Sequence, residues 1–142
     1  MPTRPLSTRD RELAAGSSLA GRRVLIVESE NLVALDLRMT LTNAGCIVVG
    51  PCSTATRARR LMGDDAIDGA LIDRTVGCAG LDPVADTLAA KGIPFVIFTS
   101  RTIDSLPERH RHRPLTGKPF VRDDLLAALE RAMNPRPPLH IV

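Results

Sequence analysis

Residues 24–31 read VLIVESEN and carry two glutamates, Glu28 and Glu30, directly after four consecutive apolar residues. Four apolar residues in a row are typical of a buried strand, so this strand is expected to end at a pair of carboxylates. Carboxylate oxygens are ligands for hard cations such as Mg²⁺, so the pair indicates a cation site. Ser29, which stands between the two glutamates, offers only a neutral hydroxyl and is a weaker ligand than a carboxylate.

Three more polar side chains follow later strand-like runs. Asp73 ends DGALID, Thr99 comes near the end of IPFVIFTS, and Lys118 follows RPLTG. If these runs are parallel strands, their carboxyl ends meet at one edge of the sheet and the side chains converge there. An aspartate nucleophile, a cation held by oxygens, and a hydroxyl and an ammonium that bind phosphoryl oxygens together suit phosphoryl transfer to Asp73.

The elements that must position these residues alternate along the chain. Strand-like runs cover residues 23–27, 46–50, 68–73, 93–100 and 113–117, and helix-like segments cover 31–44, 53–62, 81–91, 103–111 and 121–133. Asn31 is expected to cap the first helix and Gly45 to end it. In the second helix, Ser53 or Thr54 is the expected cap and Gly63 the expected end. Strands joined by helices through right-handed crossovers predict a doubly wound α/β domain, with a parallel sheet and helices on both faces.

The length of 142 residues favours one folded domain. We expect a flexible N-terminal arm at residues 1–20, the domain at 21–133 and a C-terminal tail at 134–142. The N-terminus lacks the apolar stretch of a secretory signal, and no apolar run approaches the ~20 residues needed to cross a bilayer. A cytoplasmic protein with no membrane partner is therefore expected.

The charge pattern argues against a nucleic-acid partner. The net charge is +3, and much of the excess positive charge lies in the N-terminal tail and at Arg109, Arg111 and Arg113, which is too diffuse for a nucleic-acid footprint. The chain has no Tyr or Trp and only three Phe. Neither a basic footprint nor a platform for stacking bases is evident. Lysine occurs only at Lys91 and Lys118 among 19 basic residues, so Lys118 is informative, because arginine does not imitate a compact ammonium.

Over roughly residues 22–133 the chain resembles the receiver domain of two-component response regulators. VLIVESE is similar to the strand of that family that ends in an acidic pair, and GALIDRTVG to the strand that carries the phosphoacceptor. IPFVIFTS resembles its threonine strand and TGKPF its lysine-proline signature. The resemblance implies a flavodoxin-like sheet of five parallel strands in the order 2-1-3-4-5. It also implies a signalling domain and not an enzyme, with self-phosphorylation and self-dephosphorylation at most.

The resemblance assigns roles to three residues of the predicted site. Asp73 would be the phosphoacceptor, Thr99 the hydroxyl that senses the phosphoryl group, and Lys118 the ammonium that pairs with it. The family commonly has a cis peptide between the lysine and the proline, which here are Lys118 and Pro119.

The expected cofactor is Mg²⁺, held in this family by acidic side chains and one backbone carbonyl. The corresponding ligands here are Glu28, Asp73 and the backbone carbonyl of Thr75. Ser29 stands where the family normally has the acid that binds Mg²⁺ most directly, so a weakened metal site is expected.

Two functions remain open from the sequence. The first is a stand-alone receiver that takes a phosphoryl group on Asp73 from a histidine kinase or phosphotransfer protein and signals through a downstream protein partner or as a homodimer. The alternative is a degenerate receiver that binds a partner without phosphorylation, which Ser29 and Leu115 favour because both depart from the family pattern. A phosphohydrolase is discounted because Thr75 occupies the place of its second aspartate. An anionic flavin or nucleotide would be repelled by the acids after the first strand.

Overall fold

The computed structural model describes residues 19–73, 81–99, 115–117 and 120–134 of the chain. The elements follow the order β1 (Arg23–Val27), α2 (Asn31–Asn43), β2 (Ile47–Cys52), α3 (Ala55–Asp64), β3 (Gly69–Asp73), α4 (Leu81–Ala90), β4 (Phe95–Thr99), β5 (Leu115–Gly117) and α5 (Arg122–Met133). Each lies within a few residues of an element expected from the sequence. The expected helix at 103–111 and the expected cis peptide before Pro119 lie outside the described residues.

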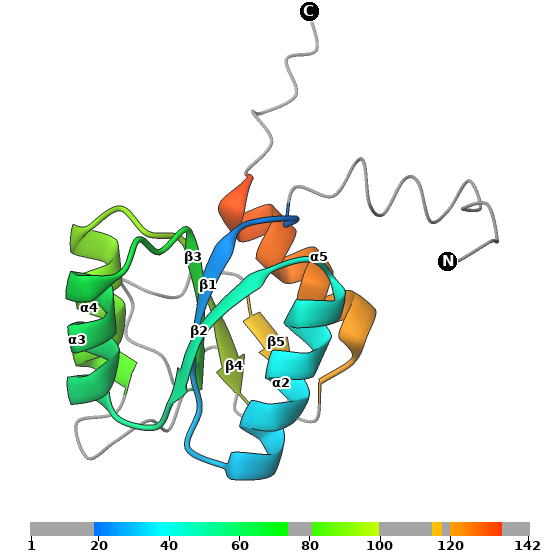
Figure 1. The fold of residues 1–142 in the computed structure, drawn as a ribbon, viewed down its shortest axis with the longest axis horizontal. Helices are drawn as coiled ribbons and strands as arrows, with labels where there is room; N and C mark the ends of the chain where they lie inside the picture. Colours follow the sequence, from blue (N-terminus) through cyan, green and yellow to red (C-terminus); the bar gives the residue numbers. More distant parts are fainter. Residues whose placement is uncertain (1–18, 74–80, 100–114, 118–119, 135–142) are drawn as a thin grey trace, which may run out of the picture.

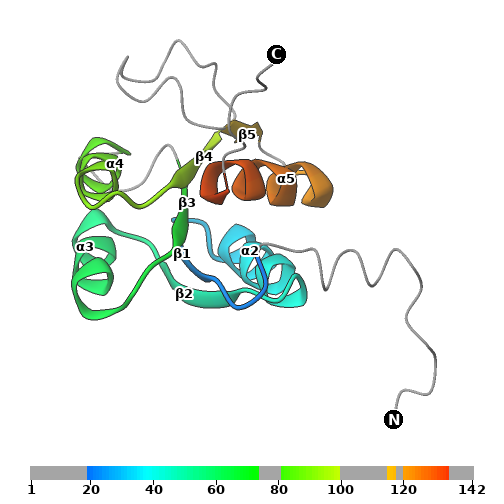
Figure 2. The ribbon, with the colours of Figure 1, turned by 90° about the horizontal axis from the view of Figure 1, so that it is seen from above.

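The strands form one sheet in the order β2-β1-β3-β4-β5, and each neighbouring pair is parallel. The order 2-1-3-4 confirms the predicted doubly wound arrangement, and the three-residue β5 continues the sheet beside β4. Figures 1 and 2 show α3 and α4 on one face of the sheet and α2 and α5 on the other. Successive strands are added on one side of β1 up to β2, and on its other side from β3 onward. Doubly wound α/β folds bind their ligands at this switch point, between β1 and β3.

Both faces of the central strands are buried, which explains their long apolar runs. On one face, residues such as Leu25, Val27 and Ile72 pack with side chains of α3 and α4. On the other face, alternate residues such as Val24 and Ile26 pack with α2 and α5. A strand that is apolar at every position can pack against helices on both faces of the sheet, as β1 and β3 do in its interior. The carboxyl ends of these two strands carry the candidate site residues.

Two helix ends differ from expectation. Glu30, not Asn31, occupies the cap position of α2 and makes no side-chain capping hydrogen bond, so Asn31 is the first helical residue. Thr54 caps α3 as predicted, its hydroxyl accepting a hydrogen bond from the Arg57 N–H at 3.2 Å. That helix continues through Gly63 and ends at Asp65, whose backbone is extended. A glycine ends a helix only where it adopts positive φ, and Gly63 does not.

Strand β2 runs two residues beyond its expected end at Gly50 because it contains a bulge. Leu25 pairs with Val49 and Val27 with Cys52, so Gly50 and Pro51 together face the single residue Ile26. Gly50 has φ of +90° and is followed by a cis peptide bond to Pro51. A Cβ on Gly50 would lie 3.1 Å from the Ile26 carbonyl oxygen, so the close approach requires glycine.

Leu19 is 2% exposed and belongs to the core cluster beneath α2 and α5. The Gly21 N–H donates to the Gly45 carbonyl at 2.8 Å, which ties this part of the chain to the end of α2. The division of the chain at residue 20 stays a prediction, because residues 1–18 lie outside the described ranges. Within those ranges, no helix has both the length and the apolar character needed to span a bilayer.

Candidate functional site

The site is built around two acidic residues on neighbouring strands. Val27 of β1 pairs with Ile72 of β3, and Glu28 and Asp73 are the next residues of the two chains. They therefore leave the sheet at the same level, at the carboxyl ends of parallel strands. Each side chain is only 2% exposed. β3 lies between β1 and β4 in the sheet, so Asp73 occupies the middle of this edge.

The Ser29 hydroxyl contacts Asp73 directly. Its Oγ donates a hydrogen bond of 3.3 Å to Oδ2 of Asp73. Glu30 is exposed, and its backbone N–H donates to Oε2 of Glu28 at 3.0 Å. The strand-to-helix turn thus places a hydroxyl on one carboxylate and an amide on the other. These two contacts could not be inferred from the spacing of residues, because they depend on the turn geometry.

Of the remaining predicted site residues, the structure describes the backbone position of Thr99 but not Lys118 or Thr75. Thr99 is the last residue of β4 and pairs with Gly117 of β5. Its strand neighbour Phe98 pairs with Asp73, so Thr99 lies one residue beyond the level of Asp73 on the adjoining strand. Lys118 and Thr75 lie outside the described residues.

Gly117 and Phe120, which flank residues 118–119, both lie near the end of β4. Gly117 lies beside Thr99. The ring of Phe120 packs edge-on against that of Phe98, with 5.6 Å between the ring centroids. The chain therefore enters and leaves the 118–119 segment next to the end of β4.

The donor set fits a divalent cation only in part. Two nearly buried carboxylates are costly to keep ionised without a positive charge nearby, and Mg²⁺ prefers such oxygen ligands. Where the family normally has a third acidic ligand, this chain has Ser29, whose hydroxyl is neutral. Among the described residues, no cluster of three or more His, Cys, Asp or Glu side chains could hold a metal. The residues present would hold Mg²⁺ with two carboxylates, fewer charges than a site with three.

A cysteine nucleophile is not supported at the described positions. Cys52 follows the bulge at the end of β2, and burial raises the pKa of its thiol to about 11, partly offset by the positive charge of Arg57. Burial raises the pKa of Cys46 to about 11 as well. A thiol with such a pKa is almost fully protonated at neutral pH and is a poor nucleophile.

Comparisons with known proteins agree with this geometry. No family model matches the chain. The phyllosphere-induced regulator PhyR of Methylorubrum extorquens is 31% identical over 132 residues, which cover 87% of this chain and 46% of PhyR. The chain thus spans about half the length of the curated relatives it matches.

Solved structures give the same result. The BeF3-activated conformation of SdrG from Pseudomonas melonis Fr1 is 39% identical, with a TM-score of 0.67, and the match covers 78% of this chain and 97% of SdrG. The response regulator REC domain of PhyR from Erythrobacter litoralis has a TM-score of 0.73 over 89% of this chain and 100% of that domain. At 22% identity it supports the fold alone.

The chain belongs to the response regulator receiver domains of two-component signalling. Membership makes it a signalling domain of flavodoxin-like fold and not a metabolic enzyme, as the sequence predicted. Receiver domains work with kinases and typically bind Mg²⁺. The similar SdrG structure was obtained in a BeF3-activated state.

Proposed function

We propose that Asp73 accepts a phosphoryl group from a histidine kinase or phosphotransfer protein and that the domain signals by protein–protein contact. The observation that carries the proposal is the position of Asp73. It lies at the carboxyl end of the central strand, beside Glu28 and one strand from Thr99. In this proposal residues 21–133 form the receiver, flanked by an arm at 1–20 and a tail at 134–142.

In the proposed reaction an oxygen of the Asp73 carboxylate attacks phosphorus, and the bond from phosphorus to the donor's histidine nitrogen breaks. The product is an acyl phosphate, and the electron pair of the broken bond stays on the imidazole. Thr99 and Lys118 would bind the phosphoryl oxygens, one through its hydroxyl and one through its ammonium. The positions of Gly117 and Phe120 support a place for Lys118 at this edge of the sheet.

Mg²⁺ would be bound by the carboxylates of Glu28 and Asp73 and the backbone carbonyl of Thr75. When bound, it would offset the negative charge between the carboxylate and the phosphoryl group. Ser29 contributes no charge, so we infer a weaker site than one with three acids. This inference rests on the Ser29 hydroxyl, which hydrogen-bonds to Asp73.

The same hydrogen bond favours a second candidate function, a receiver that binds its partner without phosphorylation. A hydroxyl that donates to Oδ2 of Asp73 stabilises the resting carboxylate and competes with an incoming metal or phosphoryl group. In that case the fold would be kept for its surfaces, and the level of phosphorylation would not change binding.

Intact-mass spectrometry after incubation with Mg²⁺ and acetyl phosphate separates the two candidates. The parent protein should gain one phosphoryl group, Asp73→Asn should gain none, and Asp64→Asn should label like the parent. Asp64 is the matched control because it is an exposed aspartate at the end of α3. Equal labelling of Asp73→Asn would remove Asp73 from the mechanism. An unlabelled parent whose amide spectrum is also unchanged by beryllofluoride would favour the phosphorylation-independent function.

A further inference from the structure

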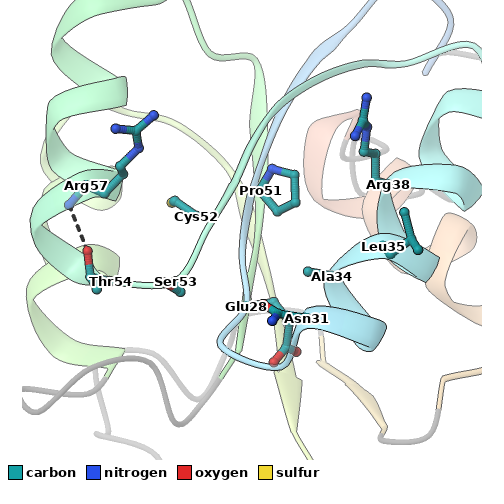
Figure 3. Close-up of a pocket in the computed structure, with 10 residues that line it drawn as sticks. All are labelled: Glu28, Asn31, Ala34, Leu35, Arg38, Pro51, Cys52, Ser53, Thr54 and Arg57. Carbon is teal, nitrogen blue, oxygen red and sulfur yellow. Dashed lines mark hydrogen bonds between the residues drawn. The ribbon is translucent and has the colours of Figure 1, made fainter.

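An open groove of about 480 Å³ lies outside the edge strand β2, between α2 and the start of α3 (Figure 3). Its floor is apolar at the centre and is formed by Ala34, Leu35 and Pro51. Leu35 is 49% exposed although it is a leucine on a helix that packs against the sheet. The remaining lining residues are Glu28, Asn31, Arg38, Cys52, Ser53, Thr54 and Arg57.

The charges of the groove are separated along its length. Figure 3 shows Arg38, from α2, and Arg57, from α3, toward one end, with Glu28 and Asn31 at the other. Glu28 is 2% exposed, whereas both arginines are exposed. The end remote from the acidic site therefore presents two guanidinium groups to solvent, one on each wall.

These guanidinium groups have no carboxylate to bind within the described part of the chain. Arg57 donates its backbone N–H to the Thr54 hydroxyl, but among the described residues neither guanidinium group forms an ion pair or a hydrogen bond. Arg38 and Arg57 are thus available for carboxylates from another molecule, which guanidinium groups bind in a bidentate manner.

The edge of β2 is unsuited to pairing with an added strand. Pro51 has no N–H to donate, and the bulge at Gly50 and Pro51 interrupts the regular edge. A bound chain must therefore be held through side chains, by the apolar floor and the two arginines, and not by extension of the sheet.

The shape of the groove favours a protein segment over a small ligand or a nucleic acid. Small-molecule sites bury most of their ligand, whereas most residues that line this groove are exposed. Bases would need an aromatic surface for stacking, and no aromatic residue lines the groove. A segment that carries both carboxylates and an apolar side chain matches the arginines and the floor together.

We propose that this groove binds an acidic segment of a partner protein, with a leucine-like side chain against Leu35 and Pro51 and carboxylates on Arg38 and Arg57. The charge separation along the groove orients the segment, because Glu28 repels a carboxylate at the opposite end. The groove shares Glu28 with the proposed metal site, but the two arginines and the apolar floor that would bind the segment are not part of the phosphoacceptor site, and binding does not require phosphorylation.

Fluorescence anisotropy tests the proposal with the full chain and a short labelled peptide made of Asp and Glu with two central leucines. The parent should bind this peptide and should bind the Asn and Gln version at least tenfold more weakly. The double variant Arg38→Glu, Arg57→Glu should lose at least tenfold in affinity. The matched control Arg59→Glu, Lys91→Glu changes the net charge equally at exposed positions that do not line the groove, and should bind like the parent.

Two further measurements locate the site and identify the class of ligand. Amide shifts on titration should move at α2 and the start of α3, and Leu35→Gln should weaken binding while the thermal unfolding temperature stays near that of the parent. Equal losses in the groove variant and in the control variant would overturn the proposal, because they would indicate only general attraction to positive charge. Tighter binding of a single-stranded RNA of equal charge, lost in the same groove variant, would overturn it in favour of nucleic acid.

Discussion

The Ser29 hydroxyl donates a hydrogen bond of 3.3 Å to Oδ2 of Asp73, across the ends of the two neighbouring strands β1 and β3. Receiver domains normally have a metal-binding acid at the position of Ser29. In this chain a neutral hydroxyl therefore donates to the proposed phosphoacceptor, where the family normally has an additional negative charge. Its consequences can be measured at the metal site.

Ser29→Asp should strengthen Mg²⁺ binding by roughly tenfold or more, about 1.4 kcal/mol, because it restores a third carboxylate. The parent should bind Mg²⁺ weakly at millimolar metal. Calorimetric titration, or amide shifts of residues around Asp73, would give both affinities. Ser29→Ala is the matched control, since it removes the hydroxyl without adding charge, and it should change the Mg²⁺ affinity far less than Ser29→Asp does. Equal affinities of the parent and Ser29→Asp would mean that another oxygen completes the metal shell.

Two glycine substitutions should have opposite effects on stability. Gly50→Ala should lower the free energy of unfolding by about 1–3 kcal/mol, because Gly50 has φ of +90° and a Cβ would lie 3.1 Å from the Ile26 carbonyl oxygen. Gly63→Ala should raise it by about 0.5–1 kcal/mol, since Gly63 is within α3 and a Cβ there would meet nothing within 4 Å. Urea denaturation of both variants measures the difference. A neutral Gly50→Ala would contradict the bulge geometry.

The buried thiols should make stability fall at alkaline pH. Burial raises the pKa of Cys46 and of Cys52 from 9.0 to about 11, so the folded state keeps each thiol protonated while the unfolded state ionises. The stability that the folded state gains from keeping its thiols protonated is fully present below pH 9 and is lost as the pH rises to 11. Around pH 10 the loss is on the order of 1 kcal/mol per thiol.

Denaturation at pH 8 and pH 10 of the parent and of Cys46→Ala, Cys52→Ala would measure this effect. The double variant should be less stable at both pH values, because the two side chains are removed from the core. Its additional loss between the two pH values should be smaller than that of the parent. Identical losses would mean that the thiols do not cause the pH dependence.

The face that includes α5 is the surface on which we expect phosphorylation-dependent contact with the downstream partner or a second copy. Arg122→Ala and Arg131→Ala should each weaken that association modestly, because single exposed charges contribute up to about 1 kcal/mol. Sedimentation of the beryllofluoride-treated protein tests the homodimer. Association weakened only by substitutions on α3, such as Arg60→Ala, would show that the opposite face of the domain carries the contact.

The alternation of apolar runs with helical segments was sufficient to predict the strands, their parallel arrangement and the helices on both faces, whereas the strand order came from the family resemblance. Such information is local, because a strand buried on two sides must be apolar at every position. Motif order was also sufficient to place Glu28, Ser29 and Asp73 at strand ends on one edge. The roles of Thr99 and Lys118 stay predictions.

Other features depend on contacts between distant segments and were decided by the tertiary structure. In the bulge, Gly50 and Pro51 of β2 face Ile26 of the neighbouring strand β1, and nothing within the sequence of β2 specifies that partner. The hydrogen bond from Ser29 to Asp73 joins residues 44 positions apart and requires a particular turn after β1. The groove lined by Arg38 and Arg57 likewise exists because α2 and α3 lie on opposite faces of the sheet, on either side of the edge strand β2. Spacing along the chain does not reveal this arrangement.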